Sequence, residues 1–379
     1  LPIYDYGLIW AALLLIGIGL VMVYSASIDL AATNQKYNFE HYYFLVRQSA
    51  YLMIAFICGY ITFLIPVYFW QRWAPYLFLI GVILLILVLI PSIGLKINGS
   101  RRWLSLVVAN FQPTELVKLF TVMYASDYVL RKSKQMRTIV KGFFPMLGVM
   151  IVTGWLVYVE PDLGALIVIT TVAMGILFLG GLTLRVIFSL AVLAPIGVWG
   201  AILISPYKQK RIQGFLEPWA PENVFDSGLQ TTQAQMAFGN GEFFGVGVGN
   251  SSAKLLFLPE AHTDFILAII GEEFGLFGVT IVIGLFAFLI VRMFGIAKES
   301  IKNNKYFAAL MAQGIAIWFA IQCIINMAVN LGLFPTKGLT LPLLSFGGSS
   351  VLVSVIAIAI VLRIDHENRR NLRGQHYNR

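Results

Sequence analysis

Charged residues are scarce in this chain. Of its 379 residues only 12% are Asp, Glu, Lys or Arg, while 59% are hydrophobic, and the mean hydropathy is +0.81. A soluble domain carries about a quarter of its residues charged and uses them to cover its apolar core. The low charge content therefore excludes an ordinary soluble domain and indicates an integral membrane protein.

Cysteine is scarce as well. Cys58 and Cys323 are the only two, and both lie in apolar stretches, where a cysteine behaves as a small hydrophobic residue. They carry no information about the redox compartment. The first apolar stretch lacks a small-residue cleavage site and leads into further apolar stretches, so we expect it to act as the insertion signal. Because the chain begins at Leu1 rather than at Met, we also expect an N-terminal tail to precede it.

Long apolar stretches are abundant. A helix needs about 20 mostly apolar residues to cross a bilayer, and ten stretches of the sequence qualify. The sequence therefore predicts an all-α integral membrane protein, a single polytopic domain over 1–379 with about ten transmembrane helices. The predicted spans are 7–27, 44–65, 75–94, 112–129, 143–160, 163–180, 184–204, 264–291, 306–331 and 343–363.

The Lys and Arg residues predict the orientation. Short cytoplasmic connections accumulate positive charge, and basic residues gather in the 130–142 connection, in the 292–305 connection and in the tail 364–379. Ten spans place all three on one side, with both termini in the cytoplasm. The excess of basic residues is then explained by anionic headgroups at the inner leaflet, and we expect no nucleic acid partner.

One connection is much longer than the others. Residues 205–263, between the seventh and eighth predicted spans, form a loop on the outer side, and loops of this length are usually functional. The loop contains Arg211 in a basic run, which an anionic ligand would explain on the side that ordinarily avoids positive charge. It also contains a glycine-rich segment that ends in Lys254. Tight turns explain those glycines, and backbone amides that cradle a phosphate or a sugar are the alternative.

Charged residues at membrane depth are candidates for function. Glu115 and Lys118 are three residues apart on one helix face, so they either form a structural ion pair or lie beside a polar substrate site. Arg101 and Arg102 stand just before them at the outer interface. Interfacial anchoring would explain both arginines, and phosphate binding is the sharper alternative because guanidinium groups present planar donors.

The sharpest local pattern is the segment 258–264, directly before the eighth span. A carboxylate at the membrane boundary, such as Asp264, can have a shifted pKa and act as a general base. Asp264 could equally be the N-cap of the following helix. Glu260, His262 and Asp264 could together hold a metal ion, although no fourth ligand is evident.

Four motifs carry a resemblance to a known family. They are Gln112-Pro113-Thr114-Glu115 with Lys118, Glu160-Pro161-Asp162-Leu163-Gly164, Leu258-Pro259-Glu260-Ala261-His262-Thr263-Asp264-Phe265, and Pro335-Thr336-Lys337-Gly338-Leu339-Thr340-Leu341-Pro342 followed by Ser345-Phe346-Gly347-Gly348-Ser349-Ser350. In this order, from about residue 7 to residue 364, the sequence resembles the SEDS family (shape, elongation, division and sporulation). The third and fourth motifs look more like the division branch than the elongation branch. Thr114 stands where the family usually has Ser, and Phe346 where Tyr is common.

The resemblance implies a peptidoglycan glycosyltransferase. Such an enzyme polymerises lipid II, the undecaprenyl-pyrophosphate-linked disaccharide-pentapeptide, on the outer face of the bacterial inner membrane, here at the division septum. Asp264 matches the family's essential loop aspartate, with Glu260, His262 and Thr263 in support. A divalent cation (Mg or Mn) is a candidate cofactor. The candidates for binding substrate or pyrophosphate are Arg101, Arg102, Glu115, Lys118, Arg211, Lys254 and Lys337.

Two other classes of function stay open. A lipid II flippase would also have many spans and basic groups, but it needs a polar path across both leaflets, whereas the unusual polar residues gather in the outer half. A non-enzymatic scaffold for division proteins is the second alternative. The resemblance also implies partners, namely nascent glycan and a class B penicillin-binding protein whose transpeptidase cross-links the strands, together with other division-site membrane proteins.

Overall fold

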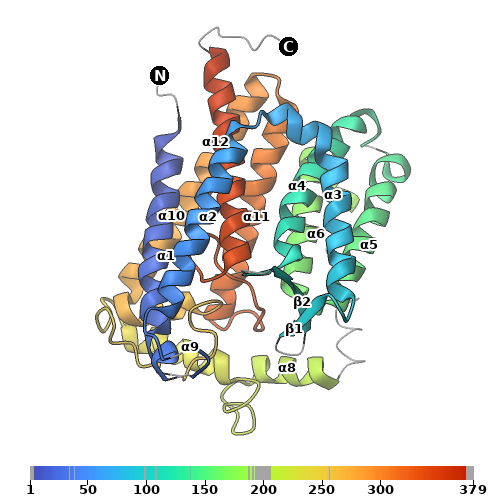
Figure 1. The fold of residues 1–379 in the computed structure, drawn as a ribbon. Helices are drawn as coiled ribbons and strands as arrows, with labels where there is room; N and C mark the ends of the chain where they lie inside the picture. Colours follow the sequence, from blue (N-terminus) through green and yellow to red (C-terminus); the bar gives the residue numbers. More distant parts are fainter. Residues whose placement is uncertain are drawn as a thin grey trace.

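The chain folds into a helical bundle in the computed structural model, which describes residues 4–372 except 34, 38, 98–99, 107–108, 137, 187, 190–191, 193–205 and 256 (Figure 1). α10 packs against α1 and α11, α12 packs against α2, and α4 packs against α3 and α6. The helices are α1 Tyr6–Thr33, α2 Tyr43–Leu64, α3 Val67–Leu89, α4 Pro113–Arg131, α5 Phe144–Val159, α6 Leu163–Leu179, α8 Pro206–Leu216, α9 Leu229–Gly241, α10 Ile266–Lys302, α11 Tyr306–Asn330 and α12 Gly348–Leu372.

The bundle is that of a multi-pass membrane protein, although ten spans are not confirmed. Within the described residues seven helices are long and apolar enough to cross a bilayer, namely α1, α2, α3, α5 with the π-helical turn Ile139–Phe143 before it, α10, α11 and α12. α4 and α6 occupy predicted spans, but α6 has 17 residues and α4 carries charges along its length. The predicted span 184–204, and with it the position of the long loop, lies largely outside the described residues.

Two helices differ in extent from the predicted segments. The third span was expected at 75–94, whereas α3 begins at Val67 and accommodates Pro75 in its interior. The tail expected from residue 364 begins inside α12, which continues to Leu372. In both cases the helix extends through residues that the hydropathy pattern excluded, because packing and ion pairs support them. Arg363 in α12, for example, binds Glu367, whose carboxylate also accepts the backbone N–H of Val67 at 3.0 Å.

Both termini lie at the same end of the bundle (Figure 1). Ion pairs hold this end together: Asp5 binds Arg292 of α10, with an Nε to Oδ2 distance of 3.0 Å, and it also lies 3.8 Å from Arg369 of α12. The long loop and the connection after α3 lie at the opposite end (Figure 1).

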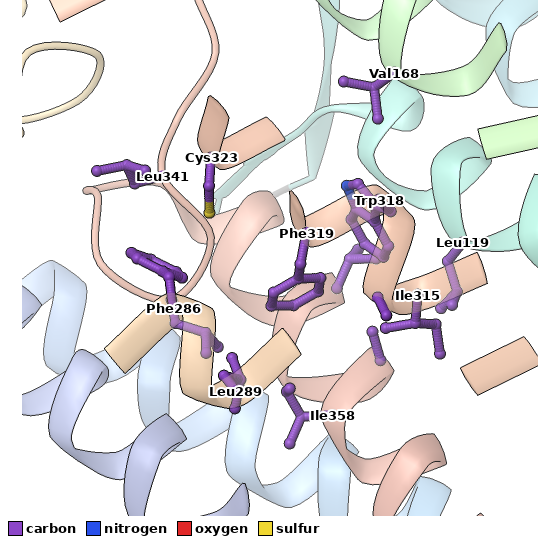
Figure 2. Close-up of a cluster of buried hydrophobic side chains, with 14 of the residues drawn as sticks. Leu119, Val168, Phe286, Leu289, Ile315, Trp318, Phe319, Cys323, Leu341 and Ile358 are labelled. Carbon is purple, nitrogen blue, oxygen red and sulfur yellow. The ribbon is translucent and has the colours of Figure 1, made fainter. Parts of the chain in front are cut away.

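The core lies where α11 meets its neighbours. Figure 2 shows Trp318, Phe319 and Cys323 of α11 together with Phe286 and Leu289 of α10. All five side chains are buried. Cys323 is therefore a small core residue, as the sequence predicted.

A small antiparallel sheet, which the sequence analysis did not predict, connects α3 to α4. Its strands are β1 Gly94–Ile97, β2 Ser100–Leu106 and β3 Ala109–Phe111, in the order β1-β2-β3. Lys96 pairs with Arg101 next to an irregularity in the register. The sheet covers the loop end of α4 and carries the two candidate arginines on β2.

α10 is broken at Gly275, whose φ of 65° lies in the left-handed region that favours glycine. The segment after α9 fills the break. Before the break, the carbonyls of Glu272 and Glu273 accept hydrogen bonds from the backbone N–H groups of residues 246 and 247, at 2.9 and 3.1 Å. After the break, the N–H groups of residues 276 and 277 donate to the carbonyls of residues 242 and 243, at 3.0 and 3.1 Å. Four backbone groups next to the break thus have partners outside the helix, which is favourable inside a membrane protein.

The glycine-rich segment of the long loop is therefore packed against α10. A Cβ at Gly241 would lie 1.8 Å from the carbonyl oxygen of Gly271, and a Cβ at Gly245 would lie 2.2 Å from that of Glu273. Gly245 also has a φ of +82°. Close approach and tight turns account for these glycines, which favours the first of the two explanations given by the sequence.

Candidate active site

Asp264 lies in a tight turn directly before α10. Glu260 begins the turn with a φ of +57°, and its carbonyl accepts the backbone N–H of Asp264 at 3.1 Å. The carbonyl of Asp264 is held from α11 by the side chains of Asn326 and Asn330, at 2.9 and 3.0 Å. The backbone of Asp264 is therefore fixed from two sides.

The alternative role of Asp264 as the cap of α10 is wrong. The helix begins after Phe265, and no side chain of that residue caps it. The buried N–H of Ala268, in the first turn of the helix, instead donates to Oδ1 of Asn330 at 3.1 Å. Among the described residues none donates a hydrogen bond to the Asp264 carboxylate, which leaves this carboxylate available for chemistry.

Three segments that are distant in sequence meet at the Asp264 carboxylate. A Cβ built at Gly338 would lie 3.3 Å from Oδ2 of Asp264 and 3.9 Å from Nη1 of Arg102. The turn before α10, strand β2 and the loop between α11 and α12 thus converge. Arg102 extends the site to the connection between α5 and α6, because its Nε donates to the carbonyl of Glu160 at 3.0 Å and its Nη2 to that of Pro161 at 2.5 Å.

Carboxyl groups crowd around this single arginine. Burial, together with the negative charges of Glu260 and Asp162, raises the pKa of Asp264 to about 7, and the charge of Arg102 opposes this rise. Burial, with Asp162, raises the pKa of Glu160 to about 9. Both Glu160 carboxyl oxygens are buried without a hydrogen-bond partner among the described residues, which fits a protonated group. Asp264, by contrast, titrates near neutral pH.

Asp162 has a structural role at the edge of the site. Its Oδ1 accepts the backbone N–H of Ala165 at 3.0 Å and so caps α6, and its Oδ2 accepts Nε2 of Gln112 at 3.1 Å. These bonds connect the start of α6 to the start of α4. The Asp162 carboxylate is therefore held at a fixed place near Asp264.

The other residues of the loop motif support the turn. The His262 ring packs against Phe44 and Phe346, with ring centroids 4.5 and 5.5 Å apart, and burial lowers its pKa to about 4. The hydroxyl of Thr263 donates to Oε2 of Glu260 at 3.0 Å. Phe346 thus has a packing contact where a tyrosine is common.

The described residues do not fit a resident metal ion. Among them no three His, Cys, Asp or Glu side chains converge as ligands. Glu260, His262 and Asp264 do not form the metal site that was considered as an alternative. The His262 ring is packed between two phenylalanines, and the Glu260 carboxylate accepts a hydrogen bond from Thr263. We therefore derive no step through a divalent cation.

Glu115 and Lys118 form a buried ion pair on α4. The Lys118 ammonium lies 2.8 Å from each Glu115 oxygen and 2.8 Å from Oε1 of Gln322, and its side chain is 0% exposed. Gln322 in turn donates from Nε2 to the carbonyl of Thr340 at 2.8 Å. The pair is thereby linked to the loop that brings Gly338 to Asp264.

A polar face of α11, which was not predicted from the sequence, also supports the site. Gln322, Asn326 and Asn330 are four residues apart, so they lie on one face of the helix. Asn326 also donates to the carbonyl of Leu339 at 2.5 Å. Three amide side chains at this spacing in an apolar helix were a usable signal. Together they hold both the turn at Asp264 and the loop at residues 339 and 340.

The remaining candidates lie on other elements. Lys254 is buried beside α10, where its ammonium contacts the carbonyl of Gly249 at 2.6 Å and Oε1 of Glu273 at 3.4 Å. Arg211 is exposed on α8, which runs beneath the bundle (Figure 1). Arg101 and Lys337 are half-buried, on β2 and on the loop after α11. The geometry thus brings Arg102 to Asp264, ties Lys118 to the same loop through Gln322, and puts Lys254 and Arg211 elsewhere.

Comparison with known proteins finds relatives that share one family and one name. The FtsW/RodA/SpoVE cell cycle protein profile matches residues 6–370. A protein of Aromatoleum aromaticum, named probable peptidoglycan glycosyltransferase FtsW, is 50% identical over 97% of this chain and 89% of its own length. One of Burkholderia thailandensis with the same name is 46% identical over 98% of this chain and 80% of its own.

Solved structures have the same fold. A chain from a study of the "structural coordination of polymerization and crosslinking by a peptidoglycan synthase complex" superimposes with a TM-score of 0.78 at 26% identity, and the match covers 96% of this chain and 98% of the other. The rod shape determining protein RodA of Thermus thermophilus superimposes with a TM-score of 0.68 at 24% identity, over 96% and 97% of the two chains.

Proposed function

This chain belongs to the FtsW/RodA/SpoVE family of cell cycle proteins, and from that premise we propose that it is a peptidoglycan glycosyltransferase that polymerises lipid II into β-1,4-linked glycan. The names of its relatives support the activity. The description of the family as cell cycle proteins supports a role in septal wall synthesis.

One observation carries the mechanistic part of the proposal. The Asp264 carboxylate stands where β2, the turn before α10 and the loop after α11 meet, and its pKa is raised to about 7. A general base is most effective when its pKa lies near the working pH. We infer that Asp264 is this base.

The reaction is a single displacement. The C4 hydroxyl oxygen of one GlcNAc forms a bond to the anomeric carbon of a second substrate's MurNAc, while Asp264 accepts the hydroxyl proton. The bond from that carbon to the pyrophosphate oxygen breaks, and its electron pair leaves with undecaprenyl pyrophosphate. Direct displacement inverts an α-linked donor to the β product, so no second carboxylate is needed as a nucleophile.

The departing pyrophosphate needs positive charge. Arg102 is the best supported cation because two of its nitrogens are fixed by the carbonyls of residues 160 and 161 while Nη1 lies toward Gly338 and Asp264. We propose that Glu115 and Lys118 act on the site through Gln322, since the Lys118 ammonium is buried. Arg101, Arg211, Lys254 and Lys337 stay predictions for this role.

Purified protein with fluorescent lipid II tests the proposed function. In liposomes without a membrane gradient we expect long glycan polymer on a gel. A flippase would move lipid II between leaflets without making polymer, and a scaffold would do neither. Absence of polymer from folded protein, both alone and with its co-purified transpeptidase, would contradict the proposal.

We further propose that both termini are cytoplasmic, in a bacterial inner membrane, and that Asp264 faces the periplasm. The charge distribution supports this orientation. In a background without Cys58 and Cys323, Phe225→Cys should react with a membrane-impermeant maleimide added to intact spheroplasts, because Phe225 is 85% exposed on the long loop. Lys134→Cys, near the basic end of α4, should stay unlabelled. The reverse pattern would overturn the orientation.

A separate class B penicillin-binding protein is the proposed partner for cross-linking. The related chain from a complex that couples polymerisation to cross-linking supports it. Its single transmembrane helix would lie against the lipid-facing side of the bundle. Copurification of such a transpeptidase with the protein extracted from its own membranes is the expected result, and its consistent absence would sink this part of the proposal.

A further inference from the structure

A cavity of about 520 Å³ lies away from Asp264, between α1 and the segment 248–255 of the long loop. One wall is formed by the second half of α1, including Tyr24, Ser25 and Asp29, and the other by the loop segment, including Lys254. The proposed polymerisation uses none of the α1 residues. The proposed polymerisation therefore does not explain this cavity.

The rim of the cavity is apolar and exposed. Val21 of α1 and Val248 and Leu255 of the loop segment line it, and they are 54%, 58% and 50% exposed. α1 is one of the helices long and apolar enough to cross the bilayer. Acyl chains can therefore reach these apolar side chains, whereas a freely soluble ligand would leave them in water.

The polar groups give the cavity a negative balance. Glu273, directly behind it, accepts the Ser25 hydroxyl at 2.6 Å and contacts the Lys254 ammonium at 3.4 Å. Glu272 accepts the Ser252 hydroxyl at 2.7 Å. With Asp29 the cavity thus has three carboxylates around one lysine, a balance that disfavours an anionic ligand.

Asp29 is the carboxylate that remains available. It is half-buried in the cavity wall, and no described residue donates a hydrogen bond to its carboxylate or forms an ion pair with it. Tyr24, five residues earlier on α1, lines the same cavity. A carboxylate beside an aromatic ring is a recognised arrangement for binding an ammonium group.

We propose that this cavity binds a membrane phospholipid whose headgroup carries a primary ammonium group, with Asp29 as the counter-charge of that ammonium. Tyr24 contacts the ammonium, the Lys254 charge on the facing wall compensates the lipid phosphate, and the apolar rim contacts the acyl chains. A zwitterionic headgroup matches these opposite charges, whereas an anionic headgroup meets an excess of carboxylates.

Native mass spectrometry of the detergent-purified protein tests the proposal. The probes are phosphatidylethanolamine and its N-acetylated form with the same acyl chains, because acetylation removes the positive charge of the headgroup amine and adds only a small acetyl group. We expect the wild-type protein to retain the N-acetylated lipid about tenfold less, the effect of losing one charge-assisted hydrogen bond. Equal retention of the two lipids would overturn the proposal.

Variants locate the effect at Asp29. Asp29→Asn should retain phosphatidylethanolamine as poorly as the wild type retains the N-acetylated lipid, and Asp29→Glu should restore retention. Glu40→Gln makes the same change of charge at an exposed residue outside the cavity and should leave retention unchanged. Undiminished retention by a folded Asp29→Asn protein would refute the site, and if that variant does not fold, the two lipids on the wild type still decide.

A competition experiment distinguishes a phospholipid from a soluble amine as the source of the ammonium group. Phosphoethanolamine has the same headgroup chemistry without acyl chains, and we expect a large excess of it to displace little of the bound phospholipid. Displacement at concentrations equal to those of the lipid would show that the apolar rim contributes nothing and that a soluble amine is the ligand. That result would contradict the assignment to a lipid.

Discussion

Asp264→Asn should reduce glycan polymerisation by roughly a hundred- to ten-thousand-fold, the usual contribution of a positioned general base. Asn has the same shape but cannot accept the proton of the attacking hydroxyl. The protein should fold normally, because the Asp264 contacts with Asn326 and Asn330 are made by its backbone carbonyl. The measurement is the initial rate of polymer formation from labelled lipid II, with a thermal melt to check folding.

Asp226→Asn is the matched control for this experiment. Asp226 lies in the same long loop, where its exposed carboxylate pairs with exposed Lys210, and exposed pairs contribute little to stability. That variant should polymerise at the wild-type rate. Appreciable polymer from a well-folded Asp264→Asn protein would exclude Asp264 as the base.

Glu115→Gln and Lys118→Met should each destabilise the protein by about 3–5 kcal/mol, because each leaves one buried charge without its partner. The pair is enclosed by α4 and α11, with the ammonium also bound to Gln322. We expect both single variants to lose most polymerisation as well. The double variant removes both charges, so its melting temperature should recover in part.

Activity in the double variant separates the two roles of the pair. Polymerisation should stay low while stability recovers, because Gln322 loses the ammonium that helps to hold it against Thr340 beside the Asp264 site. Measuring the melting temperature and the polymerisation rate on the same preparations makes the comparison. Full recovery of glycan synthesis together with stability would show that the pair only braces the two helices.

Local patterns in the sequence predicted most of the helices and singled out Asp264 as a candidate base. Asp264 stood out because a charge beside an apolar helix is visible in the sequence itself. Its surroundings were not predictable in this way, because Arg102, Glu160 and Gly338 come from three separate connections that only the folded bundle brings together. The pattern also could not decide whether Asp264 caps α10, because the N–H of Ala268 is bound by Asn330 of a different helix, α11.

The remaining differences also have nonlocal causes. The break in α10 at Gly275 depends on the segment after α9, whose backbone replaces the missing helical hydrogen bonds. The apolar stretches and single glycines of the sequence do not reveal that one segment replaces the helical hydrogen bonds of another. Likewise, the sheet between α3 and α4 is stabilised by pairing between short strands around Arg101 and Arg102. A search for long apolar helices does not detect such short strands.

The pH dependence of polymerisation tests the central claim, that ionised Asp264 is the base, most directly. Because the base acts only when deprotonated and its pKa is raised to about 7, the wild-type rate should fall as the pH decreases through that value and level off above it. Glu260→Gln removes a negative charge that raises this pKa, so its midpoint should move to lower pH. A wild-type rate that is flat from about pH 5 to pH 8, or an unshifted midpoint in a folded Glu260→Gln protein, would contradict the account.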